Sequence, residues 1–159
     1  MSAADGLMDL MAAPLAAAAA VDPTDAQAAV ADLEAAYPLH GAEGTALREA
    51  LLAAVEDGSI CDRQGKGDIR YSRLSRPDEN DHGMSIDFVW MTGAGIDHIH
   101  PRGEINLCLA VEGDPRFDGH REGWVVFEPD SRHVPTVESG RMLIAYFLPG
   151  GAVVWPDAL

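Results

Sequence analysis

The sequence of 159 residues predicts a mainly β protein, built as a small sandwich or barrel and preceded by a helical segment. Apolar residues follow a helical period up to about residue 60, and after it they alternate with polar residues or form short runs. Turn-rich segments separate these runs and no helical stretch lies among them, which is typical of all-β sandwiches and barrels. We therefore expect a helical segment over 1–60 and a β-barrel domain over 61–159.

Two well-marked helices are expected in the first part of the chain. The first occupies 22–38, where Asp22 is placed as the N-cap and a proline follows at the first helical position. The second lies within 44–58 and is followed by a glycine that stops it. A weaker helix is expected over 3–12. The second helix carries its apolar residues one turn apart on one face: Leu47, Leu51 and Val55.

Short strands are expected throughout the second part of the chain. Within 84–91, Ile86, Phe88 and Trp90 occupy alternate positions, so their side chains point to one side of a sheet. Segments rich in glycine, proline and aspartate separate the strands. The expected strands are 68–74, 84–91, 105–111, 123–129, 142–149 and 152–155.

The acidic balance of the chain limits its partners. The formal net charge is −15, and residues 1–60 hold ten acidic residues against one base, Arg48. Such a surface disfavours nucleic acid and anionic membranes, so we expect neither as a partner. No apolar run is long enough to cross a bilayer and the alanine-rich start lacks a basic leader, so we expect a cytoplasmic protein. Cys61 and Cys108 form neither a disulfide framework nor a CxxC metal motif.

The stretch DHIHPRGEINLCLA, residues 97–110, holds the first candidate site residues. His98 and His100 are two residues apart, so on a strand both imidazoles point to the same side. Glu104 follows a Pro-Arg-Gly segment that lets the chain bend, and His133 follows a later strand. Three imidazoles and one carboxylate can hold a metal ion and leave positions open for water or substrate. The plainer alternative is a set of solvated loop residues.

Two segments resemble the motifs of the cupin superfamily. HIHPRGE matches the core of the first motif, and GWVVFEPDSRH resembles the second, which ends at His133. The resemblance implies a cupin-type double-stranded β-helix, or jelly-roll, barrel with an N-terminal α-helical segment. It also implies that His98, His100, Glu104 and His133 ligate a divalent metal ion, with iron, manganese, zinc and nickel as candidates.

A narrower resemblance covers nearly the whole chain. HIHPRGEINLCLA, HVPTVESGRMLIAYFLPGGAVVW and the alanine-rich helical start are similar to the 4-hydroxylaminobenzoate lyase family. The family resemblance implies an enzyme that converts 4-hydroxylaminobenzoate to protocatechuate (3,4-dihydroxybenzoate) and ammonium in nitroaromatic degradation. Glu104, His98 and His100 would then be its catalytic residues.

A small aromatic carboxylate substrate requires a cation and apolar walls. An arginine fork suits a carboxylate, and Arg102 and Arg132 each flank an expected metal ligand. Trp90 and Tyr146 are candidates for the walls around the ring. The plainer alternative is that the arginines are surface charges and the aromatic residues belong to the core.

Two other functions fit the same residues. One is a metal-dependent cupin dioxygenase acting on a small aromatic or thiol substrate, and oxygen consumption on turnover would indicate it. The other is a non-catalytic cupin that binds or senses a small carboxylate, and it would bind ligand without forming product. In each case we expect a homodimer.

Overall fold

The computed structural model describes residues 3–156. Three helices come first in the chain: α1 (Ala3–Ala19), α2 (Ala26–Ala36) and α3 (Ala42–Glu56). The strands that follow are β1 (Arg63–Gln64), β2 (Arg70–Ser75), β3 (Met84–Ala94), β4 (His98–His100), β5 (Glu104–Phe117), β6 (Gly123–Phe127), β7 (Ser131–His133) and β8 (Thr136–Pro149). A short 3-10 helix, η1 (Pro77–Glu79), precedes β3.

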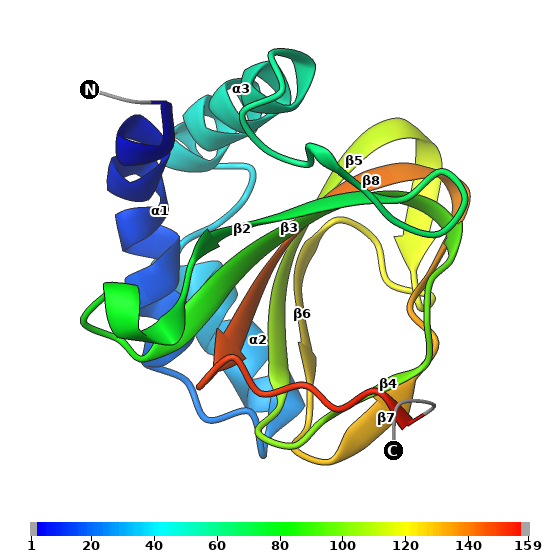
Figure 1. The fold of residues 1–159 in the computed structure, drawn as a ribbon. Coiled ribbons are helices and arrows are strands. Elements are labelled where there is room, and N and C mark those ends of the chain that lie inside the picture. Colours follow the sequence, from blue (N-terminus) through cyan, green and yellow to red (C-terminus); the bar gives the residue numbers. More distant parts are fainter. Residues whose placement is uncertain (1–2, 157–159) are drawn as a thin grey trace.

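The strands form two antiparallel sheets. The large sheet has the order β1-β2-β3-β8-β5-β6, and the small one pairs β4 with β7. Val154 adds a further bridge to Ile99 of β4. The chain thus leaves the large sheet after β3, after β6 and after β8, each time to join the small one, which is a jelly-roll connectivity. Figure 1 shows the large sheet curling toward β4 and β7, with the helices on its outer side. The predicted mainly β jelly-roll barrel with an N-terminal helical segment is confirmed.

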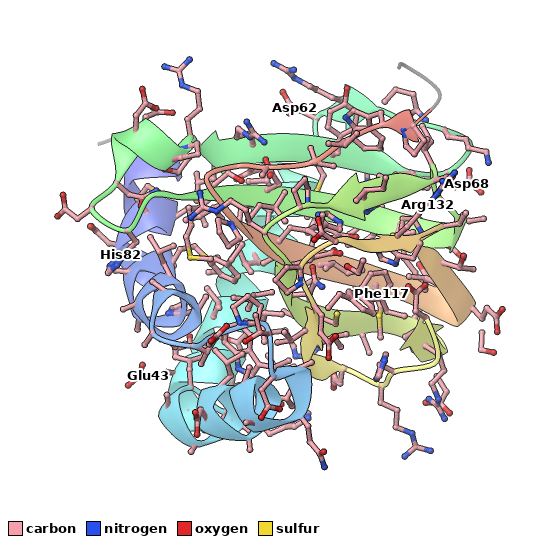
Figure 2. The ribbon with its side chains drawn as sticks, turned by 90° about the horizontal axis from the view of Figure 1, so that it is seen from below. Glu43, Asp62, Asp68, His82, Phe117 and Arg132 are labelled. Atoms are coloured by element: carbon pink, nitrogen blue, oxygen red, sulfur yellow. The ribbon has the colours of Figure 1, made fainter. Side chains whose placement is uncertain are left out.

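The two faces of the large sheet pack into different hydrophobic clusters. On β3, Ile86 and Phe88 join the helices in one cluster. Tyr146 of β8 joins Phe117 in the other, inside the barrel. The ring centroid of Phe117 lies 6.2 Å from that of His133, and Figure 2 shows Phe117 on the barrel side, away from the helices. The face to which a side chain points therefore decides whether it can reach the barrel interior.

The helix starting near residue 22 begins later than predicted. Asp25 is the N-cap of α2, and its side chain accepts a hydrogen bond from the Ala28 amide at 3.1 Å. Asp22 instead accepts from the amide and hydroxyl of Thr24, which closes a turn before the helix. The prediction of Asp22 as N-cap is wrong because two aspartates compete, and only one is followed by helical backbone.

α1 is longer than predicted. It continues from the expected end at residue 12 to Ala19 and contains Pro14. A proline inside a helix costs about 3 kcal/mol or more, because a hydrogen bond is lost and its ring crowds the preceding turn. Burial of a helical stripe against the core offsets that cost; its residues are Leu7, Met11, Leu15 and Ala18.

Hydrogen bonds join the helices to the barrel. The Trp124 indole of β6 donates to the Tyr37 carbonyl at 2.7 Å, and the Trp124 amide donates to Glu34 of α2 at 3.0 Å. Arg48 of α3 donates to both carboxylate oxygens of Glu122, at 2.9 and 2.5 Å. One hydrophobic cluster also spans helices and sheet. The division into a helical segment over 1–60 and a β-barrel domain over 61–159 stays a prediction. Within 3–156, no helix is long and apolar enough to cross a membrane.

Candidate metal centre

Four side chains converge inside the barrel, one ligand atom of each lying within 4.8 Å of the others. They are His98 and His100 of β4, Glu104 at the start of β5 and His133 at the end of β7. The pairing register explains the grouping, because His98 lies directly opposite His133 and the two histidines of β4 share a face. We call these four residues the His–Glu cluster; the sequence predicted all of them as neighbours.

The surroundings of His98 fix which of its nitrogens carries a proton. Its Nδ1 lies 2.8 Å from the carbonyl oxygen of Ile96, which can only accept, so Nδ1–H is the donor. Burial, followed by the nearby His100, lowers the pKa of His98 and keeps the ring neutral. The lone pair of Nε2 is therefore free and faces the cluster. Metal-ligating histidines are commonly oriented by such a bond from the other nitrogen.

His133 and Glu104 form the charged part of the cluster. Burial alone would raise the pKa of Glu104, but its contacts with His100 and His133 outweigh burial and bring that pKa to about 2. Burial likewise opposes the charge on His133, yet its bonds to Asp118 and Glu104 raise its pKa to about 9. Nε2 of His133 lies 3.1 Å from Glu104 Oε2, and Nε2 of His100 lies 2.7 Å from the same oxygen.

Several polar atoms of the cluster are buried without a hydrogen-bond partner among residues 3–156. They are Nε2 of His98, both ring nitrogens of His100, and Oε1 of Glu104. His100 Nε2 is near the Glu104 carboxylate but lacks the angles of a hydrogen bond. Such groups cost about 1–3 kcal/mol each when they stay unpaired. Because imidazole and carboxylate are the donors that divalent transition metals prefer, this cluster fits a divalent metal ion.

Comparison with known proteins assigns the chain to a family. Residues 12–155 match the family described as 4-hydroxylaminobenzoate lyase (PnbB). The chain belongs to this family. The match includes all four residues of the His–Glu cluster and most of the helical segment.

Two curated members of the lyase family are similar to part of the chain. A 4-hydroxylaminobenzoate lyase from Nocardioides sp. is 33% identical over 92 residues, which is 53% of this chain and 54% of that protein. One from Pseudomonas putida is 29% identical over 100 residues, 53% of this chain and 57% of that protein. The chain thus spans about half the length of the curated relatives it matches. A solved RmlC-like cupin from Shewanella frigidimarina has a TM-score of 0.40 and 19% identity, over 55% of this chain and 81% of that one.

Sequence reasoning missed two residues beside the His–Glu cluster: Asn106 inside the barrel, and Trp155, which is 45% exposed. Asn106 is two residues beyond Glu104 on β5 and is fully buried, and its Oδ1 has no hydrogen-bond partner in the described part of the chain. It lies opposite Tyr146, the one predicted wall residue that faces this interior. The ring centroid of Trp155 lies 5.2 Å from that of His98. Strand alternation from Glu104 could have found Asn106, whereas nothing in the sequence placed Trp155 beside His98.

The other predicted substrate-binding residues lie away from the cluster. Trp90 is on the helix-facing side of β3, with the guanidinium carbons of Arg70 and Arg141 each 5.6 Å from its ring centroid. Arg132 points away from His133 on β7 and binds both carboxylate oxygens of Asp97, at 3.1 and 2.6 Å. Arg102 lines a cavity to which no residue of the His–Glu cluster contributes.

Asp118 orients His133 from a tight hairpin turn. Its Oδ2 accepts from His133 Nδ1 at 2.5 Å, and its Oδ1 accepts from the Thr136 amide at 2.8 Å. Asp118 and Gly119 have positive φ angles, 47° and 87°, as a type I′ turn requires. The Asp-Gly pair in the sequence could have predicted the turn. It could not have predicted the contact between Asp118 and His133, because this contact depends on how β7 lies beside the turn.

Replacing Asp118 by Asn is expected to weaken divalent metal binding by about 10- to 100-fold. Asn tolerates the left-handed conformation and still accepts from Thr136, but it lacks the charge that orients His133. The measurement is competition against a chromophoric chelator. Asp130→Asn is the matched control, since Asp130 is exposed and also has a positive φ of 65°. Equal metal affinity in the Asp118 and Asp130 variants would show that Asp118 does not position His133.

Proposed function

We propose that this chain catalyses the reaction of its family: 4-hydroxylaminobenzoate and water give protocatechuate and ammonium. The observation that carries the proposal is the family match over residues 12–155, which includes the His–Glu cluster. The reaction is redox-neutral, because the oxygen lost from nitrogen reappears on the neighbouring ring carbon. It therefore needs no dioxygen, unlike the dioxygenase that uses the same kinds of ligand.

We infer that the His–Glu cluster holds a divalent metal ion, with iron, manganese, zinc and nickel as the candidates. Bound there, the ion would supply a Lewis acid for the hydroxylamine oxygen and lower the pKa of a bound water. His98 is prepared for this role because its neutral Nε2 faces the cluster. His133 would be held in place by Asp118.

The protein's own residues would divide the remaining work. Once the N–O bond is broken and oxygen is on the neighbouring carbon, an imine remains on the ring. Glu104 would hold the metal through one carboxylate oxygen and accept, with the other, a proton from the water that attacks the imine carbon. Tyr146 and Phe117 would contact the substrate ring and exclude bulk water. We propose a small aromatic carboxylate as the substrate class; the homodimer and the cytoplasmic location stay predictions.

Metal removal is expected to lower ammonium release from 4-hydroxylaminobenzoate by at least about 100-fold. The protein would be treated with a chelator, assayed for ammonium and protocatechuate, and then reloaded with each candidate metal in turn. Recovery with one metal, without oxygen consumption, is the expected result. Full activity in a metal-free preparation would contradict the metal assignment. Release of no ammonium under any loading would contradict the lyase proposal, and oxygen uptake would support the dioxygenase.

A further inference from the structure

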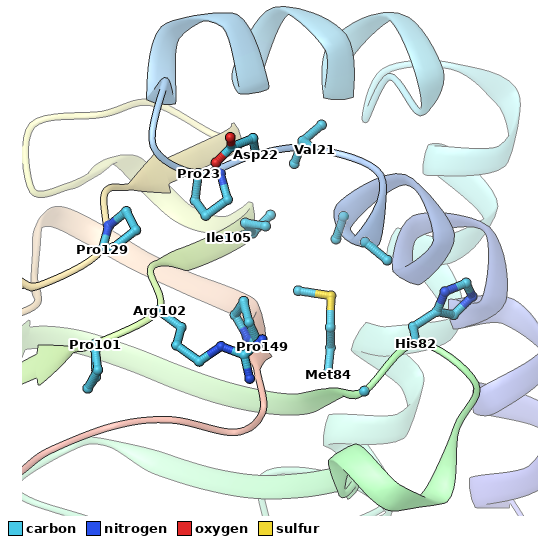
Figure 3. Close-up of a pocket in the computed structure, with 13 residues that line it drawn as sticks. Val21, Asp22, Pro23, His82, Met84, Pro101, Arg102, Ile105, Pro129 and Pro149 are labelled. Carbon is cyan, nitrogen blue, oxygen red and sulfur yellow. The ribbon is translucent and has the colours of Figure 1, made fainter.

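A cavity of about 480 Å³ lies between the end of α1, the segment before α2, and the end of the barrel where β5 begins. Figure 3 shows it open in front of Met84 and Ile105, with Arg102 and Pro149 on one side and Pro23 on the other. Its volume is in the range of sites that bind small organic molecules.

This cavity is separated from the His–Glu cluster by the large sheet. Glu104 and Ile105 are successive residues of β5, so their side chains point to opposite faces. Glu104 belongs to the cluster, whereas Ile105 lines the cavity and packs with Met84 in the helix-side core. A molecule bound in the cavity therefore cannot touch the His–Glu cluster. For the same reason, Arg102 cannot orient a substrate that is bound at the cluster.

Arg102 is the cation of the cavity. Within residues 3–156 it forms no hydrogen bond or ion pair, although the chain carries a net charge of −15. The acid in the lining is Asp22, whose Oδ1 accepts from the amide and hydroxyl of Thr24. The guanidinium rests over Gly150, where any Cβ would collide with its Nη1. A turn without a side chain thus leaves room for the Arg102 head group at the edge of the cavity.

The walls define what else a ligand must offer. Val21, Met84 and Ile105 are apolar, and proline rings surround them. His82 lies on the exposed rim and adds a second nitrogen donor. Because Asp22, His82 and Arg102 are polar, these apolar residues form only part of the lining. An arginine fork beside an apolar patch suits an anion that has an apolar body.

We propose that this cavity is a second binding site, which takes a small organic carboxylate with an apolar body on Arg102. It goes beyond the proposed lyase activity and does not depend on it. The loop that carries Arg102 also joins His100 to Glu104, so residues of the two separate sites lie within five consecutive positions, 100–104.

The test is a titration of the full chain with benzoate, followed by amide chemical shifts. We expect saturable shifts at cavity residues such as Gly83, Met84 and Ile105. Arg102→Gln should weaken benzoate binding at least about 10-fold, because a charged hydrogen bond is lost. Arg121→Gln, a change of an exposed arginine outside the cavity, should leave binding unaltered. Benzamide and inorganic phosphate should each bind at least about 10-fold more weakly than benzoate.

A second pair of variants changes the position of the Arg102 guanidinium without removing its charge. Gly150→Ala should weaken benzoate binding, since its Cβ displaces the guanidinium. Gly67→Ala is the matched control, with φ of 59° against 62° at Gly150 and open space around the added Cβ. The proposal is overturned if Arg102→Gln leaves the affinity unchanged, if phosphate binds as tightly as benzoate, or if benzoate shifts only the amides of the His–Glu cluster. The last result would leave the lyase proposal intact, whereas cavity shifts in a protein that releases no ammonium would support this site alone.

Discussion

Glu104→Gln is expected to lower ammonium release from 4-hydroxylaminobenzoate by about 100- to 10,000-fold, the range for loss of a general acid–base residue. Glu104 is fully buried, and one of its oxygens lies within 2.7 Å of His100 and 3.1 Å of His133. Gln keeps the size of the side chain but loses its charge. It would therefore neither accept a proton from water nor help the histidines to hold a cation. Kinetics of ammonium release and the metal content per chain are the measurements.

A matched control separates this effect from general loss of acidic charge. Glu128 is an exposed carboxylate just after β6, and Glu128→Gln should leave both activity and metal content unchanged. Circular dichroism should show that both variants are folded, because the change at Glu104 conserves volume. Near-normal activity of a folded Glu104→Gln protein would show that the carboxylate has no part in the reaction.

The sequence predicted the cluster because its geometry depends on short-range regularities. Strand alternation alone places His98 and His100 on the same face, and Glu104 begins the next strand after a short turn. His133 is thirty-three residues from His100, and its place depends on the pairing of β4 with β7. Local periodicity does not predict the pairing of β4 with β7. The expectation that His133 joins the other three residues came from the resemblance to cupins.

The predicted substrate-binding residues show where such reasoning stops. Tyr146 and Trp90 were chosen as aromatic residues on strands, yet one faces the barrel interior and the other faces the helices. Alternation shows which side chains share a face, but not whether that face points to the helices or to the barrel interior. This depends on the tertiary structure, because the helices cover only one side of the sheet. Arg102 is two residues from Glu104, but the loop geometry turns it to a separate cavity. Proximity in sequence to a ligand therefore did not predict proximity in space.

The helical segment and the barrel are expected to unfold together, and Trp124 is the residue that tests this. Its indole is buried between them, bonded to the Tyr37 carbonyl and packed with Phe147 at a centroid distance of 5.9 Å. Trp124→Ala should lower the free energy of unfolding by about 3–5 kcal/mol, the range for a large core aromatic. Trp124→Phe keeps most of the ring but leaves the Tyr37 carbonyl unpaired, so it should cost about 1–3 kcal/mol.

The shape of the transition decides between one cooperative unit and two. Denaturation followed by far-UV circular dichroism, which reports the helices, should coincide with amide exchange in β5 and β8 for the parent protein and for each variant. Leu10→Ala is the control, because Leu10 is 41% exposed on α1 and its loss should change stability by no more than about 0.5 kcal/mol. If the helices of Trp124→Ala melt while the barrel amides stay protected, residues 1–60 are a separable domain. A shared transition would mean that burial against α2 and α3 stabilises the outer face of the sheet, and with it the strands that carry the His–Glu cluster.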